Sequence, residues 1–137
     1  MSRAWIAGFL LVGATALAQA PGVGMKQLML DLIHPASNQI LVTIFRGGPK
    51  NESEWAAVRH SALTLAESGS LLQAQRRDAD WAADVKLLTD AANSAYQAAL
   101  AKDAKALTAV ADRLDGSCTT CHKQYRPNVF PREGGSK

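Results

Sequence analysis

The stretch Trp81-Ala-Ala-Asp-Val-Lys-Leu-Leu-Thr-Asp-Ala-Ala-Asn-Ser-Ala-Tyr-Gln-Ala-Ala99 decides the fold class of this chain. Its apolar residues recur in steps of three and four, at Trp81, Val85, Leu88, Ala92, Ala95 and Ala99. That spacing places them on one face of an α-helix, and the stretch contains no proline or glycine to interrupt it. Asp80, directly before the stretch, is the expected N-terminal cap.

The same periodicity occurs twice before this stretch. A first helix is expected from Met25 to the Gly47-Gly48-Pro49 sequence, and a second from Asn51 or Ser53 onward. Gly69 falls inside the second helix or at its end. The expected inward-facing residues are Met25, Leu28, Met29, Leu32, Ala36, Ile40 and Ile44 in the first helix, and Trp55, Val58, Ala62, Leu65 and Leu72 in the second.

A further helix is predicted near the C-terminus. Asp103 is its expected cap, and Arg126-Pro127 is expected to end it because the residue before a proline is pushed out of the helical region. Its expected inward-facing residues are Leu107, Val110, Leu114, Cys118 and Cys121.

The composition of the whole chain agrees with a single helical domain. The 137 residues are 47% hydrophobic and carry a formal net charge of +3. This length suits one domain, and this composition excludes a disordered chain and a disulfide-dense one. The charge is too small for a nucleic-acid partner to be expected. Because no alternating strand pattern is present, the helices predict an all-α, antiparallel four-helix bundle.

Residues 1–18 have the pattern of a secretory signal peptide. Arg3 precedes an uncharged apolar run that is short for a membrane span and ends in Ala16-Leu17-Ala18. We expect cleavage after Ala18, although cleavage after Ala20 also fits and an uncleaved anchor is the alternative. The expected product is residues 19–137, exported to the periplasm without a membrane span.

The chemistry of the chain is expected on the last helix, where Cys118-Thr-Thr-Cys-His122 has the C-x-x-C-H pattern of covalent c-type haem attachment. On a helix, Cys118, Cys121 and His122 share one face. Two thiols there can form thioethers with the vinyl groups of one porphyrin, and the imidazole can bind its iron as the proximal ligand. One covalent haem c is therefore the expected cofactor.

Two other interpretations of the motif compete with haem. A redox-active cysteine pair is possible in an exported protein, but the βαβ pattern that accompanies such pairs is missing. A zinc site would need a fourth ligand, and neither His34 nor His60 lies at a convincing spacing.

The motif Cys118-x-x-Cys121-His122-x-x-Tyr125-Arg126, near the C-terminus of a helical chain, resembles the class II c-type cytochromes, the cytochrome c-prime family. The resemblance in architecture covers the whole of residues 19–137, whereas the specific matches are local. It implies that Tyr125 packs on the bundle and that Arg126 lies near the haem. A core position for Tyr125 and a solvated helix end for Arg126 are the simpler interpretations.

The resemblance also suggests the second axial ligand of the iron. Low-spin members of the family use a methionine of the first helix, and Gln27-Leu28-Met29 resembles the segment that supplies it. Met29 is therefore the expected distal ligand, with Met25 as the fallback. Members of the other branch leave this position open and bind diatomic gases, and a methionine stripe is otherwise ordinary core filling.

His34-Pro35 interrupts the first helix, because Pro35 cannot donate a hydrogen bond to the carbonyl of Asp31. A kink is therefore expected just after Met29. His34 lies about 140° around a regular helix from Met29, so the two are not expected to face the iron together. His34 is expected at the surface or as a group that supports a ligand, and His60 likewise.

Together these features predict an exported cytochrome that carries single electrons between redox proteins and is not an enzyme. No paired carboxylates stand out near the haem motif, and no polar groups suited to cleaving an O–O bond are evident. The alternative is a five-coordinate cytochrome c-prime that binds nitric oxide or carbon monoxide. The resemblance also implies that a homodimer is possible.

Overall fold

A computed structural model describes residues 22–75 and 77–129, and within these ranges the chain is all-helical and contains no strand. The expected signal peptide, residues 1–18, lies outside the described residues.

The first helix is continuous but contains one wide turn. It consists of α1 (Met25–Leu28), the π-helical turn η1 (Met29–Ile33) and α2 (His34–Phe45). In η1 the backbone N–H of His34 donates to the carbonyl of Met29, five residues earlier. The irregularity lies where Pro35 predicts it, because a wider turn moves the carbonyls of the preceding turn away from the proline ring.

The wide turn changes which residues of this helix are buried. Leu28 is followed in the core by Ile33, a step of five residues, before the regular spacing resumes at Ala36 and Ile40. Leu32, expected to face inward, is half-buried and packs against the core, and the neighbouring Ile33 takes the fully buried position. The extra residue of the π turn accounts for the shift.

The helix α3 (Glu52–Ala74) begins where the sequence predicts. The backbone N–H of Glu54 donates to Asn51 Oδ1 at 2.9 Å, and the N–H of Lys50 donates to Glu54 Oε2 at 2.8 Å. The first hydrogen bond satisfies a donor that the helix itself leaves unpaired, and the second fixes the residue that precedes the cap. The preceding turn needs Gly47 and Gly48 because their φ angles are +88° and +83°.

The helix α4 (Trp81–Ala101) begins at the predicted residue but has a different cap. Asp80 already has helical backbone angles, so its side chain does not act as the cap we expected. Instead Asp78 Oδ1 accepts from the N–H of Trp81 at 3.1 Å and from that of Asp80 at 3.2 Å.

The last helical rod is divided into α5 (Ala104–Thr108) and α6 (Ala111–Tyr125). Asp103 caps α5 as predicted, accepting from the N–H of Ala106 at 2.9 Å. The break between the two helices was not predicted, because Leu107 and Val110 keep the helical spacing and are both buried across it. The rod ends at Tyr125, as Pro127 predicts.

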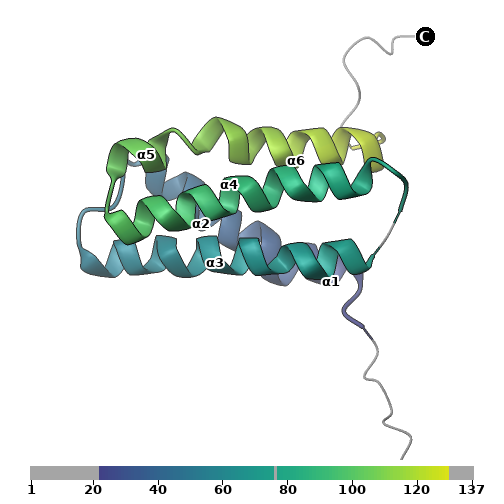
Figure 1. The fold of residues 1–137 in the computed structure, drawn as a ribbon, viewed down its shortest axis with the longest axis horizontal. Coiled ribbons are helices and arrows are strands. Elements are labelled where there is room, and N and C mark those ends of the chain that lie inside the picture. Colours follow the sequence, from purple (N-terminus) through teal and green to yellow (C-terminus); the bar gives the residue numbers. More distant parts are fainter. Residues whose placement is uncertain (1–21, 76, 130–137) are drawn as a thin grey trace, which may run out of the picture.

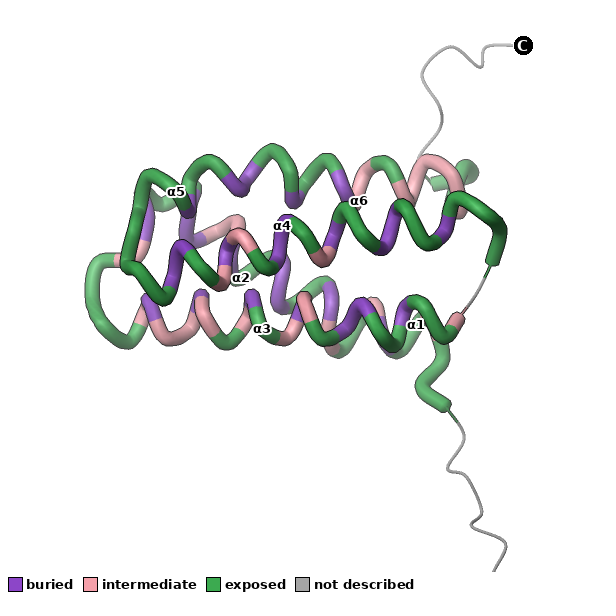
Figure 2. The backbone as a smooth tube through the Cα atoms, viewed as in Figure 1, coloured by how far each residue is buried: buried purple, intermediate pink, exposed green. Residues whose placement is uncertain are grey.

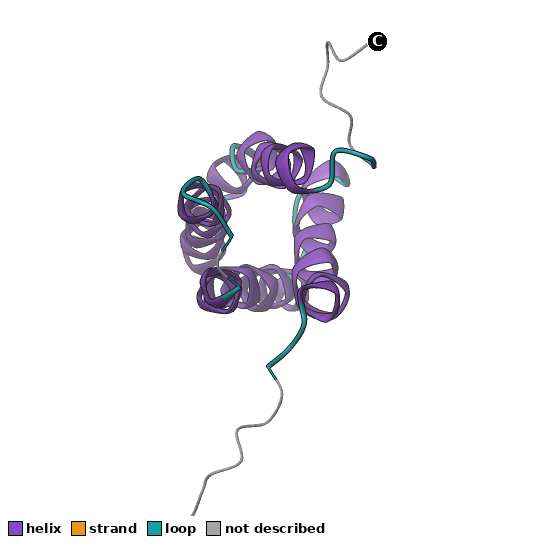
Figure 3. Cartoon of the chain, turned by 90° about the vertical axis from the view of Figure 1, so that its right-hand side faces the viewer, coloured by secondary structure: helices purple, strands orange, loops and turns teal. Residues whose placement is uncertain are grey.

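The four rods run antiparallel around one axis, as Figures 1 and 3 show, so the predicted bundle architecture is confirmed for the described residues. Buried residues line the inner face of every rod (Figure 2). The first helix, Met25–Phe45, is also long and apolar enough in composition to cross a membrane. A core helix meets the same test, and here its inner face packs into the bundle.

Candidate functional site

The candidate site lies at one end of the bundle. The antiparallel topology brings together there the start of the first helix, the end of α3, the start of α4 and the end of α6 (Figure 1). A cavity of about 370 Å³ lies among these ends, and a second of about 520 Å³ adjoins it. The residues that line both cavities are Met29, Leu30, Trp81, Cys121, His122 and Arg126.

The end of α6 contributes the predicted attachment motif to this site. Cys118, Cys121 and His122 all line the first cavity, since residues three and four apart share a helix face. All three are half-buried, whereas Leu114 and Ser117 before them are buried. Figure 2 shows this change along α6, from buried to half-buried positions. The core is thus incomplete at the motif.

The two cysteines are free thiols whose environment disfavours the thiolate. Burial raises the pKa of Cys121 to about 11, with smaller contributions from Asp84 and from Cys118. Burial likewise raises the pKa of Cys118, and Asp115 adds to this effect. Catalytic and redox-active cysteines depend on a lowered pKa, so this environment does not favour a thioredoxin-like pair.

The imidazole of His122 is held in its neutral form. Burial lowers its pKa first, and the positive charge of Arg126 lowers it further. The backbone N–H of Arg126 also donates to the carbonyl of His122 at 2.8 Å. A neutral imidazole is the form that binds a metal ion.

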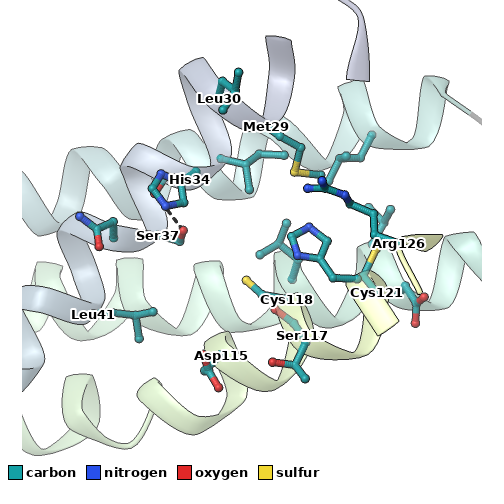
Figure 4. A pocket seen from close by; sticks show the side chains of 18 of the residues that line it. Met29, Leu30, His34, Ser37, Leu41, Asp115, Ser117, Cys118, Cys121 and Arg126 are labelled. Atoms are coloured by element: carbon teal, nitrogen blue, oxygen red, sulfur yellow. Dashed lines mark hydrogen bonds between the residues drawn. The ribbon is translucent and has the colours of Figure 1, made fainter. Parts of the chain in front are cut away.

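Met29 approaches the site from the first helix. Figure 4 shows its side chain on the side of the cavity opposite Cys118 and Cys121. Met29 lines both cavities, whereas Met25 lines only the second. Of the two methionines, Met29 is therefore the one that shares the first cavity with the thiols and the imidazole.

His34 lines the same cavity as Met29. In a regular helix, five residues rotate a side chain by about 140°. The π turn between these two residues widens this part of the helix, and both side chains line the cavity. His34 is exposed, and its carbonyl accepts from Ser37 Oγ at 3.1 Å (Figure 4).

Tyr125 and Arg126 both line the second cavity. Tyr125 packs edge-to-face on Trp81, with ring centroids 4.9 Å apart, and its hydroxyl donates to Asp78 Oδ1 at 2.5 Å. The guanidinium of Arg77 covers both rings, at 5.4 and 5.6 Å from their centroids. These contacts hold the end of α6 against the start of α4.

The imidazole of His122 and the thioether of Met29 line one cavity, and both groups can bind a haem iron. Within residues 22–75 and 77–129, no three His, Cys, Asp or Glu side chains converge to hold a metal. An iron already held by a porphyrin needs only axial ligands from the protein, and an imidazole and a thioether are typical ones. Apolar side chains, including Ile33, Leu41 and Leu88, line much of the first cavity.

Asp84 is a site residue that the sequence analysis missed. It lines the first cavity and is only 7% exposed. A carboxylate beside Val85 on the apolar stripe of α4 was the signal that could have identified it. Ser37 and Asn38 also line this cavity, so polar groups are nearer to the thiols than expected. His60 is exposed on α3 and does not line either cavity.

Comparison of the chain with protein-family models, with curated proteins and with solved structures gives no match. The fold and the cavity define the class of this protein, an all-α four-helix bundle with a cavity at one end.

Proposed function

We propose that this protein is an exported monohaem c-type cytochrome that carries single electrons between redox proteins. The observation that carries the proposal is the presence of Cys118, Cys121, His122 and Met29 on one cavity. The cysteines would bind the porphyrin, and His122 and Met29 would be the axial ligands. Bound there, the haem supplies the one-electron couple of its iron.

The protein's own residues have three tasks in this function. Arg126 and the surrounding burial keep His122 neutral and able to ligate. Apolar residues such as Leu88 exclude water, which is one of the factors that tune a haem potential. Trp81 and Tyr125 fasten α6 to α4, so the attachment residues keep their place beside Met29.

Covalent attachment is tested by extraction with acidified acetone. The exported wild-type protein should keep its haem on the polypeptide, whereas Cys118→Ala and Cys121→Ala variants should lose stable double attachment. A Thr120→Ala variant is the matched control, because Thr120 is exposed between the two cysteines and does not line either cavity. Loss of all haem from the wild type on extraction would refute covalent attachment.

A five-coordinate, gas-binding cytochrome is the second candidate. The observation in its favour is that the cavity continues past Met29 along Ile33, Ser37 and Leu41, which leaves room beside the methionine. Absorption spectra of the oxidised and reduced protein distinguish the two functions. A high-spin wild type that readily binds carbon monoxide would favour gas binding, and a low-spin one would favour electron transfer.

A further inference from the structure

Asp84 has an unsatisfied polar atom inside the candidate site. It lies in the first turn of α4, on the stripe that contains the buried residues Trp81 and Val85. Its Oδ2 is buried, and no hydrogen-bond donor of the described residues reaches it. Such groups are rare in folded proteins because each costs the free energy of its lost hydration.

The surroundings of Asp84 do not favour its negative charge. Burial raises the pKa of Asp84 above its ordinary value of 3.8, and the charges of Asp80 and Asp78 raise it further. Among the described residues, no Lys or Arg forms an ion pair with this carboxyl group. Burial and charge repulsion thus both shift the pKa of Asp84 upward and favour the protonated carboxyl group.

Other ionisable groups line the same cavity, from three directions. His34 belongs to the first helix, Asp115 to α6, and Arg126 follows α6. The thiols of α6 have raised pKa values, and His122 is neutral. His34 and Asp115 are both exposed, so Asp84 is the carboxyl group of this cavity that is shielded from solvent.

We propose that Asp84 tunes the reduction potential of the haem and binds a proton when the iron is reduced. This inference rests on the proposed haem function. One electron from a donor protein enters the iron, and one proton from solvent binds the Asp84 carboxylate; oxidation releases both. An added electron in a cavity of low dielectric constant raises the proton affinity of a nearby carboxylate. By linkage, the proton then favours the reduced state by the same factor.

The test is the reduction potential of the haem-loaded full chain as a function of pH, from about pH 4 to about pH 9. The wild-type potential should fall as the pH rises through the titration of Asp84. Asp84→Asn should remove this pH dependence of the potential. At pH values above the titration of Asp84, it should also shift the redox equilibrium of the haem toward the reduced form about tenfold or more. A change in packing alone would not remove a pH dependence.

Two matched variants test whether the pH dependence of the potential comes from Asp84. Asp80→Asn removes an exposed carboxylate one turn away, and His34→Gln removes an ionisable side chain that lines the same cavity as Asp84. Both should keep a pH-dependent potential. An Asp84→Asn protein with the wild-type pH dependence would overturn the proposal, and so would loss of the dependence in His34→Gln.

A measurement without haem separates this inference from the proposed function. In the unloaded chain, Asp84 binds protons more tightly when folded than when unfolded, so it destabilises the fold increasingly as the pH rises above about 3.8. The Asp84→Asn protein should therefore have a higher midpoint of thermal unfolding than the wild type at neutral pH. In acid, where Asp84 is protonated, the two midpoints should become equal. A haem-free wild type would refute the cytochrome and the redox role together, whereas a haem-loaded wild type with a pH-independent potential would refute only the role of Asp84.

Discussion

Because α6 stays helical as far as Tyr125, one cavity is lined by Cys118, Cys121 and His122 together. Their relation is local, so helical spacing alone was enough to predict that they share a face. Asp84 and His34 join the same cavity through tertiary packing and through the π turn. Neither relation follows from a regular helical repeat, so helical spacing alone does not place Asp84 or His34 on this cavity.

The proposed role of Met29 as an iron ligand gives a prediction at this scale. If that proposal holds, Met29→Ala should convert a low-spin haem protein into a high-spin one that binds carbon monoxide, because the thioether that would bind the iron is removed. The truncation should cost no more than about 2–5 kcal/mol of stability, since Met29 is only half-buried. Absorption spectra with and without carbon monoxide measure the change.

Met25→Ala is the matched control for this variant. Met25 is also half-buried on the first helix but does not line the cavity of Cys118. The Met25→Ala protein should keep the low-spin spectrum. A Met29→Ala protein that stays low-spin would show that another residue ligates the iron, and His34→Gln in the same background would then identify or exclude His34.

At the scale of elements, the beginnings and ends of helices followed from short motifs. Asn51 and Asp103 cap their helices as predicted, and Pro127 marks the last boundary. The cap of α4 did not follow, because Asp78 and Asp80 are both plausible and the loop conformation decides between them. The break before α6 could not be predicted from the hydrophobic spacing, because Leu107 and Val110 on its two sides keep the helical spacing and are both buried.

The contact between α3 and α4 depends on Gly69. A Cβ atom at this position would lie 2.3 Å from Cγ2 of Thr89, which real Cβ atoms do not tolerate without movement. Gly69→Ala should therefore lower the free energy of unfolding by about 1–3 kcal/mol through overpacking. Thermal or denaturant unfolding, followed by circular dichroism, measures the loss.

Gly116→Ala is the control for overpacking. Gly116 is exposed within α6, and no atom lies within 4 Å of a Cβ built there. Alanine should stabilise α6 by up to about 1 kcal/mol, because glycine is the poorer helix former. If Gly69→Ala also proved neutral or stabilising, the close approach of α3 and α4 would be wrong.

For the whole molecule, the bundle architecture followed from the sequence, but the cavity did not. Four amphipathic segments with short connections allow few other arrangements, so the bundle architecture could be predicted from the sequence. The cavity arises where four helix ends meet, and the burial of each side chain there depends on how the rods are staggered. The homodimer stays a prediction, which sedimentation of the purified protein tests.

Export gives a prediction for the whole chain. Arg3, the apolar run and Ala16-Leu17-Ala18 predict that the mature protein begins at Gln19. N-terminal sequencing of protein recovered from the periplasm should show this residue first. A start at Pro21 would move the cleavage site by two residues, and a start at Met1 would contradict processing.

The π turn of the first helix also bears on how such a site can change by insertion or deletion. One surplus residue is absorbed within Met29–Ile33, so the apolar stripe stays in phase with the core on both sides of the turn. An insertion accommodated in this way keeps the buried positions in phase with the core, yet it changes which side chain follows Met29 onto the cavity. Deleting one residue from the turn would close it into a regular helix and carry His34 away. The lining of the cavity can thus change through single-residue changes in length while the remaining helices keep their positions.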